Sequence, residues 1–195
     1  MDKLIIKGQS NLYGKIEIPG AKNSALPIMA SSILSSDGLI LENLPYLNDI
    51  ISMNRLLKNF NIKIKQEKLK TTFNTQMIKN NVADYNIVRK MRASILILGP
   101  LLARFKTAKV SLPGGCAIGN RPIDIHLFGL EKLGAKFKVE NGFVYGKTKK
   151  LIGNTINLPF PSVGATENII MTAVLAEGKT ILNNAAKEPE IIDLS

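Results

Sequence analysis

The chain has 195 residues, of which 45% are hydrophobic and 21% charged, and its formal net charge is +11. This length allows a buried core in one domain or in two small ones. The single cysteine excludes an intrachain disulfide framework and fits a reducing compartment. No apolar run approaches the roughly 20 residues that span a bilayer, and the first residues lack the pattern of a secretory signal. We therefore expect a cytoplasmic globular protein with no membrane partner.

The positive charge comes mainly from lysine. Five of the 26 basic residues are arginine, and many of the lysines lie in polar runs such as 63–70 and 147–150. Clustered Lys and Arg can neutralise the phosphates of a nucleic acid. However, dispersed lysine among many Asn and Ile residues is more typical of a general compositional bias than of a nucleic-acid-binding groove. A small anionic substrate would need only a few placed cations. No basic strand is interleaved with aromatic residues, which make up 6% of the chain, so we expect no nucleic-acid partner.

The N-terminal third alternates between strands and helices. Residues 3–7 and 12–18 alternate in polarity and predict two short strands. A helix that is apolar on every side follows over 25–34, with Asn23 or Ser24 available as its cap. The next expected elements are a strand at 38–45, an amphipathic helix at 49–60 and an alternating strand at 62–65.

The same order of elements recurs at a step of 70 residues. The equivalent positions are Lys22, Arg92 and Ser162 at the starts of apolar helices, and Gly38, Ala108 and Gly178 at the following strands. The second pass runs as one helix from Met91 to about Arg104, and adds a helix at 123–133 and strands at 134–139 and 143–145. A repeat of this length is one supersecondary unit, which we interpret as β-α-β-α-β-β with the apolar helices inside. The third pass stops within a predicted helix, so we expect the chain to be part of a longer protein.

One loop combines a soft acid with a fixed cation. The segment Ser111–Asp124 places Cys116 among three glycines and two prolines, with Arg121 five residues further on. These glycines and prolines favour an exposed turn, and a nearby cation lowers the pKa of a thiol from its ordinary value of about 8.5. A lone cysteine is more often a small buried hydrophobe, but burial is difficult in a Gly-Gly-Cys loop. We interpret Cys116 as a reactive acid or nucleophile.

Three cations stand at or before predicted helix starts. A helix N-terminus presents unbonded N–H groups and partial positive charge, which favour anions. Lys22 and Arg92 head two apolar helices, and Arg121 precedes the helix that starts near Ile123. Each could be an ordinary solvated surface charge. Their equivalent placement instead predicts a site for phosphates and a carboxylate.

Four motifs resemble the UDP-N-acetylglucosamine enolpyruvyl transferases. They are Pro19–Pro27, Met91–Ser94, Ser111–Asp124 and Ser162–Thr166. The resemblance runs through the whole chain but covers only about the first half of that family. It implies an inside-out α/β barrel, with three β-α-β-α-β-β repeats per domain and the third repeat incomplete here. It also implies that residues 1–21 belong to the second domain, that residues 22–195 form the first, and that the C-terminal domain is missing.

The resemblance further implies an activity and its residues. The family transfers the enolpyruvyl group of phosphoenolpyruvate to the 3′-hydroxyl of UDP-N-acetylglucosamine, releases phosphate, and opens peptidoglycan precursor synthesis for cell-wall growth and division. It needs no metal or organic cofactor. By resemblance Cys116 is the proton donor, forms a covalent adduct with phosphoenolpyruvate and is the target of fosfomycin. The residues that resemble the phosphoenolpyruvate site are Lys22, Asn23 and Arg121. Those that resemble the nucleotide-sugar site are Asn23, Arg92, Arg121, Pro122, Ile123, Asp124, Ile125, Ser162, Val163 and Gly164.

Some features depart from the family or leave alternatives open. Phe160 replaces a lysine often found before the Ser-Val-Gly turn, and the family's catalytic base lies in the absent domain. We therefore expect the chain alone to be inactive. His126, the only histidine, is interpreted as helix-end packing in preference to catalysis. The rival interpretations are the sister transferase that acts on shikimate 3-phosphate, which has no cysteine in this loop, a non-catalytic basic binding protein, and a degraded remnant.

Overall fold

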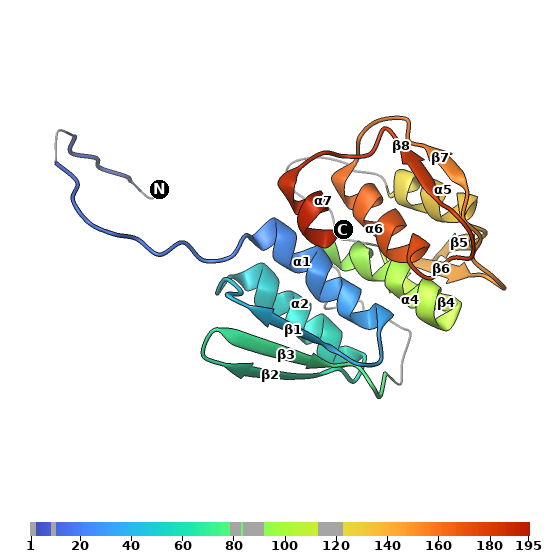
Figure 1. The fold of residues 1–195 in the computed structure, drawn as a ribbon, viewed down its shortest axis with the longest axis horizontal. Helices are drawn as coiled ribbons and strands as arrows, with labels where there is room; N and C mark the ends of the chain where they lie inside the picture. The colour runs from blue at the N-terminus through green and yellow to red at the C-terminus, as the bar shows by residue number, and fades with distance from the viewer. Residues whose placement is uncertain (1–2, 9–10, 79–82, 84–91, 113–122) are drawn as a thin grey trace.

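A computed structural model describes residues 3–8, 11–78, 83, 92–112 and 123–195 (Figure 1). The helices, with short 3-10 helices written η, are α1 (Lys22–Ser31), η1 (Ser32–Leu34), α2 (Asn48–Asn59), η2 (Arg92–Ile97), α4 (Leu98–Phe105), α5 (Asp124–Lys132), α6 (Val163–Ala173) and α7 (Pro189–Leu194). The strands are β1 (Leu39–Glu42), β2 (Lys63–Glu67), β3 (Lys70–Asn74), β4 (Thr107–Ser111), β5 (Lys136–Glu140), β6 (Phe143–Lys147), β7 (Thr155–Asn157) and β8 (Ile181–Asn183).

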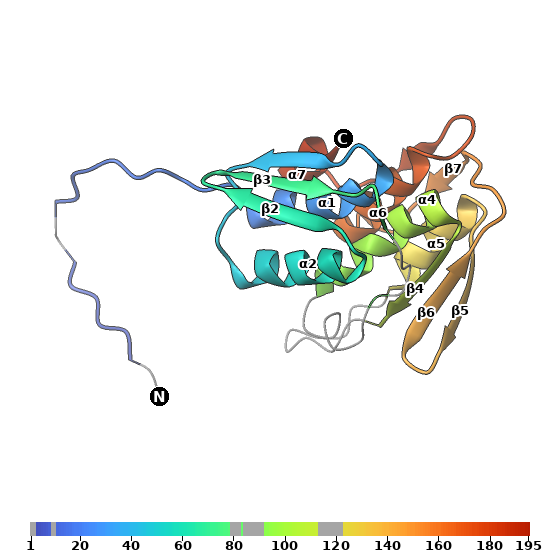
Figure 2. The same cartoon turned by 90° about the horizontal axis from the view of Figure 1, so that it is seen from below.

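The strands form three small sheets that follow the repeat. The first two sheets are antiparallel and share one strand order, β1-β3-β2 and β4-β6-β5. The third pairs β7 with β8 in parallel across α6. Figure 2 shows the two three-stranded sheets on different sides of the body, with helices between them. The identical order of the first two sheets confirms the repeat that the sequence predicts.

The apolar helices fill the interior. Side chains from α1, α2 and α4 join the inner faces of the first two sheets in one core cluster. Its fully buried members include Met29, Leu56, Phe73, Leu98 and Leu101. A smaller cluster around Leu133, Ile156 and Ile169 lies under the third sheet. Because a helix without a polar face can only be stable when it is surrounded, the sheets take the outside.

The two strands predicted at 3–7 and 12–18 are absent, so this prediction is wrong. The residues described in this segment are exposed and have no regular secondary structure. The segment projects from the body in Figure 1 and meets it where the Gly20 N–H donates to the Asn43 carbonyl at 3.0 Å. Alternating polarity is a necessary sign of a half-buried strand, but a strand also needs a neighbouring strand for its hydrogen bonds. Leu12 and Tyr13 are accordingly uncovered, with exposures of 95% and 106%.

The helix predicted from Met91 to Arg104 is divided in two. The described part begins as the 3-10 helix η2 and continues as α4 from Leu98. Pro100 has no N–H for the carbonyl four residues before it, and its ring crowds that carbonyl. The turn that precedes Pro100 therefore does not follow a regular α-helical ladder, and short 3-10 segments are common at such points.

Gly38 and Gly178 occupy equivalent places in the repeat, before β1 and β8, and share one backbone conformation in different surroundings. Gly38 and Gly178 have φ of +83° and +82°. A Cβ on Gly38 would collide with the Phe73 carbonyl oxygen, whereas one on Gly178 would meet open space. We expect Gly178→Ala to lower the free energy of unfolding by about 1–2 kcal/mol, the cost of a left-handed backbone. Gly38→Ala should cost at least about 1 kcal/mol more, because β3 must also move. Urea unfolding followed by circular dichroism measures both, and equal losses would contradict the collision.

Candidate functional site

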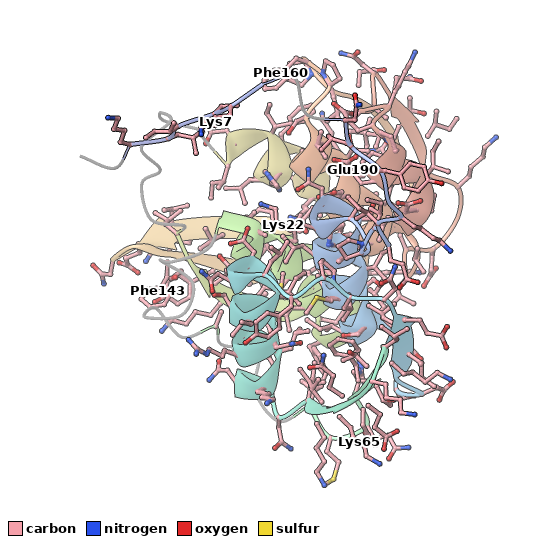
Figure 3. All side chains as sticks on the ribbon, turned by 90° about the vertical axis from the view of Figure 1, so that its left-hand side faces the viewer. Lys7, Lys22, Lys65, Phe143, Phe160 and Glu190 are labelled. Atoms are coloured by element: carbon pink, nitrogen blue, oxygen red, sulfur yellow. The ribbon has the colours of Figure 1, made fainter. Side chains whose placement is uncertain are left out.

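The start of α1 combines helix N–H groups with a cation. Lys22 is the first residue of α1, and its Nζ lies 2.9 Å from Oδ2 of Asp49 in α2, with both side chains 43% exposed. The N-cap is Ala21, which supplies no side-chain cap, and the first turn holds no acidic residue. Figure 3 shows Lys22 near the centre of the face that carries the α1 start. The geometry suits an anion, because the N–H groups and Nζ are both positive.

The prediction that Asn23 or Ser24 caps α1 is wrong. The helix already starts at Lys22, so both residues lie within its first turn. The Ser24 hydroxyl donates to Oδ2 of Asp193 in α7 at 2.5 Å and so joins the last helix to the first. Asn23 is exposed, and Pro27 has no N–H to donate to the Asn23 carbonyl. Asn23 therefore presents its polar groups to solvent beside Lys22.

Two of the segments predicted for the nucleotide-sugar site come together at the starts of α5 and α6. Ile123 and Ile125 are partly buried, and Asp124 between them is exposed. Ser162 caps α6 by accepting from the Ala165 N–H at 3.4 Å. A Cβ on Gly164 would lie 3.1 Å from Cε1 of His126. The α5 start, the partly buried Val163 and the Ser162 cap therefore form one neighbourhood.

His126 is a packed helix residue, as the sequence predicts. It is 9% exposed, and its Nδ1 lies 2.9 Å from the carboxamide nitrogen of Asn168 in α6. Because an amide nitrogen only donates, Nδ1 is the acceptor, and this assigns the proton of the neutral ring to Nε2. His126 thus serves the contact between α5 and α6.

Several predicted site residues have no described geometry. Cys116, Arg121 and Pro122 lie outside the described residues, and only the backbone of Arg92 is placed, at the start of η2. Phe160, at the position of the family lysine, is 56% exposed, and Figure 3 shows it at the edge of the face that holds Lys22. The described site is therefore the starts of α1, η2, α5 and α6.

Sequence reasoning missed a buried acid. Glu167 in α6 is 4% exposed. Burial, with smaller contributions from the negative charges of Glu190 and Glu188, raises the pKa of Glu167 to about 8. The signal that could have identified it is a charged residue in a helix that otherwise holds only apolar and uncharged polar side chains. Within the described ranges, no three His, Cys, Asp or Glu side chains gather closely enough to hold a metal ion.

The outer face of the second sheet is basic and aromatic, which sequence reasoning also missed. A hollow of about 430 Å³ lies over this face. Its lining includes Lys109, Lys136, Lys138, Tyr145 and Lys147. Nζ of Lys109 lies 5.1 Å from the ring centre of Tyr145 and 4.6 Å from that of Phe143. The premise that no basic strand is interleaved with aromatic residues is therefore wrong for this sheet, because the aromatic rings of β6 lie between the lysines of its hairpin partner β5 and Lys109 of β4, which is distant in sequence.

The comparison with protein families identifies the class. The family described as EPSP synthase (3-phosphoshikimate 1-carboxyvinyltransferase) matches residues 6–195. The chain therefore belongs to the EPSP synthase family.

The curated relatives carry a more specific name. UDP-N-acetylglucosamine 1-carboxyvinyltransferase 2 of Carboxydothermus hydrogenoformans is 51% identical over 195 residues, which are 100% of this chain and 46% of the relative. UDP-N-acetylglucosamine 1-carboxyvinyltransferase of Acidiphilium cryptum is 52% identical over 196 residues, 100% of this chain and 47% of the relative. The chain spans about half the length of the curated relatives it matches.

Solved structures confirm the fold class. The enolpyruvyl transferase NikO from Streptomyces tendae superposes with a TM-score of 0.81 at 18% identity, over 96% of this chain and 44% of that one. EPSP synthase from Acinetobacter baumannii gives 0.72 at 18% identity, over 92% of this chain and 42% of that one. The fold is therefore that of the enolpyruvyl transferases, and the described residues form a part of it with three sheets around interior helices.

The buried carboxyl of Glu167 predicts a pH dependence of stability. The folded chain keeps a proton that the unfolded chain releases between its ordinary pKa of 4.5 and about 8. Stability should therefore fall as pH rises through this window. We expect Glu167→Gln to remove that fall, and at pH 8.5 to exceed the wild type by up to a few kcal/mol more than at pH 5. Urea unfolding at each pH measures it, with the exposed Glu131→Gln as control. Parallel profiles for wild type and Glu167→Gln would contradict the prediction.

Proposed function

We propose that this chain is the N-terminal part of an enolpyruvyl transferase that acts on phosphoenolpyruvate and UDP-N-acetylglucosamine. One observation carries the proposal, which is the 51% and 52% identity, along the whole chain, to proteins named for this activity. The relatives are about twice as long, so the proposal includes a further domain, to which residues 1–21 also belong. The uncovered apolar side chains of residues 3–18 support that assignment, because burying them would be favourable.

The proposed reaction is an addition followed by an elimination. The 3′-hydroxyl of the sugar gives its proton to the base, which we assign to the further domain, as its oxygen bonds to C2 of phosphoenolpyruvate and C3 gains a proton, which gives a tetrahedral intermediate. Loss of a proton from C3 and cleavage of the bond between C2 and the phosphate oxygen restore the double bond and release phosphate. We assign the protonation of C3 to Cys116, whose thiol can act as a general acid and whose thiolate can form the covalent adduct.

We assign phosphoenolpyruvate to the start of α1. Lys22 and Arg121 would bind its phosphate and carboxylate, and Asn23 would reach both substrates from the exposed first turn. The contact between Lys22 and Asp49 supports this role, since it holds Nζ in place. Fixed positive charges stabilise the reaction most when they face the atoms on which negative charge develops.

We assign the nucleotide sugar to the starts of η2, α5 and α6. Arg92 and the segment from Arg121 to Ile125 would bind it, with Asp124 accepting from the uracil edge and Ser162–Gly164 at the diphosphate. The proximity of Gly164 to His126 supports this grouping. Phe160 offers no charge to the diphosphate, so this contact should be weaker than in relatives with a lysine there. The reaction would serve peptidoglycan precursor synthesis in the cytoplasm, and thereby cell-wall growth and division.

A second candidate function, binding of single-stranded nucleic acid, is favoured by the basic and aromatic face of the second sheet. Lysines can contact phosphates and aromatic rings can stack on bases. Lys109 already covers the two neighbouring rings at 4.6 and 5.1 Å, which leaves them less open to stacking. This candidate therefore ranks below the transferase.

No helix within the described ranges is long and apolar enough to cross a membrane.

The proposal predicts that activity needs the second half of the fold. Phosphate release from phosphoenolpyruvate and UDP-N-acetylglucosamine should be absent with the 195-residue chain alone. Adding the C-terminal half of the Carboxydothermus hydrogenoformans relative in trans should produce measurable release, and Cys116→Ser should abolish it, because a hydroxyl is a much weaker acid than a thiol. Fosfomycin should modify the wild-type chain at this cysteine, as peptide mass spectrometry would detect. Turnover by the unsupplemented chain would contradict the assignment of the base to the other half.

The proposal also predicts that placed cations bind substrate and dispersed lysines do not. In the complemented protein, Arg121→Ala should weaken binding of UDP-N-acetylglucosamine or phosphoenolpyruvate by about 1.5–3 kcal/mol, the range for hydrogen bonds to charged groups. The matched control replaces Lys63, Lys65 and Lys70 by Gln and should leave both affinities nearly unchanged. Calorimetric titration measures them. Loss of affinity in the control with none in Arg121→Ala would contradict the site. Sub-micromolar binding of an oligonucleotide, lost when Lys109 and Lys138 are replaced, would favour the second candidate.

A further inference from the structure

Asn168 is a buried polar residue that links three elements. It lies in α6 and is 0% exposed. Its Oδ1 accepts from the Gly99 N–H at 2.8 Å, and its Nδ2 donates to the Ile95 carbonyl at 3.0 Å and to Nδ1 of His126 at 2.9 Å. Both ends of the carboxamide are therefore satisfied, which is the condition for burying such a group without a large cost.

The carboxamide takes the place of a backbone contact. In a continuous α-helix the Gly99 N–H would donate to the Ile95 carbonyl, four residues earlier. Here both groups bond to Asn168, which acts as an inserted peptide group at the junction of η2 and α4. The insertion needs a glycine, because a Cβ at position 99 would crowd Oδ1 of Asn168 at 2.5 Å. A side chain from another helix therefore acts together with Pro100 to keep the η2–α4 junction out of a regular α-helical ladder.

The residues that Asn168 bonds lie close in sequence to the residues proposed to bind the nucleotide sugar. Ile95 follows Arg92 by three residues in η2, and His126 follows Asp124 by two residues in α5. Asn168 itself stands six residues after Ser162, whose hydroxyl caps α6. His126 also lies against Gly164. One buried side chain therefore sets the relative positions of three helix starts without belonging to any of them.

We propose that Asn168 is the positioning residue of the nucleotide-sugar site, which fixes the starts of η2, α5 and α6 relative to one another. The proposal rests on the proposed function for the ligand and on the three hydrogen bonds for the coupling. Without the carboxamide, the Gly99 N–H can close onto the Ile95 carbonyl. Pro100 still has no N–H for the Leu96 carbonyl, so conversion of all six residues of η2 from 3-10 to α-helix is the upper limit, and it would shorten them by about 3 Å, from the difference in rise per residue. Arg92, at the far end of η2, would move by a comparable distance.

The test compares Asn168→Ala with Thr172→Val. Thr172 is also buried in α6, and its hydroxyl bonds within that helix, to the Asn168 carbonyl at 2.7 Å, so it is a matched loss of a buried polar group. Calorimetry with UDP-N-acetylglucosamine should show at least tenfold weaker binding for Asn168→Ala and less than threefold for Thr172→Val. Amide hydrogen exchange without ligand should speed up together in peptides 92–99, 123–127 and 162–168 for Asn168→Ala, but only within α6 for Thr172→Val.

A third variant, Asn168→Asp, separates positioning from loss of stability. Its carboxylate can still accept from the Gly99 N–H, and from His126 if the neutral ring carries its proton on Nδ1, but it cannot donate to the Ile95 carbonyl. The affinity of Asn168→Asp should therefore lie between those of wild type and Asn168→Ala, and an affinity no better than that of Asn168→Ala would contradict the role of the retained contacts. This variant also replaces Asn168→Ala in the comparison if the latter does not fold.

The outcomes are distinct. Wild-type affinity in Asn168→Ala, exchange changes confined to α6, or equal weakening in Asn168→Ala and Thr172→Val would overturn the positioning role. If the wild-type chain, alone and complemented, does not bind UDP-N-acetylglucosamine, the proposed function fails. The exchange experiment then still decides whether Asn168 couples the three segments.

Discussion

Burial of the repeat's central helices on nearly every side is the constraint on which this structure depends. α6 lies at the centre of it, packed on α4 on one side and on α5 on the other. A glycine stands at each contact, Gly99 against Thr172 and Gly129 against Ile169, and a Cβ at either would collide with α6 side chains. Close approach of this kind removes apolar surface from water and fills space to the density of a protein interior. The sheets are consequently outside, and helix starts supply the polar groups of the candidate site.

The electrostatics of the helix starts are not uniform, which bears on how two anionic substrates would be distinguished. The α1 start carries Lys22, partly balanced by Asp49, and no acid in its first turn. The α5 start carries Asp124 in its first turn, which reduces its attraction for phosphate. The α6 start is capped by a neutral serine. A small dianion is therefore favoured at α1, whereas α5 is better suited to a neutral hydrogen-bond donor.

Much of this arrangement could be predicted from the sequence, and the failures have physical causes. The repeat, the apolar helices and the strands at 38–45 and 134–139 follow from local periodicity, which a single chain segment contains. The strands at 3–7 and 12–18 depend on a neighbour that periodicity does not supply. The break before Leu98 follows in part from Pro100. This proline is visible in the sequence, but the continuous apolar pattern around it led to the prediction of a single helix. The basic face of the second sheet depends on the pairing of Tyr145 with Lys109 on one side and with Lys138 on the other, which only the register determines.

The carboxamide of Asn168 within the η2–α4 junction has a consequence for how this sequence can change over generations. A side chain at position 99 would collide with the Asn168 carboxamide. Loss of the carboxamide at position 168 would leave Gly99 without its hydrogen bond, and the glycine would then only destabilise the helix. Neither position can drift alone without loss, although they are separated by 69 residues. Substitutions at positions 99 and 168 are therefore coupled in their effect on stability. A lineage that abandons the pair must acquire both substitutions nearly together, along with a regular helix through the junction.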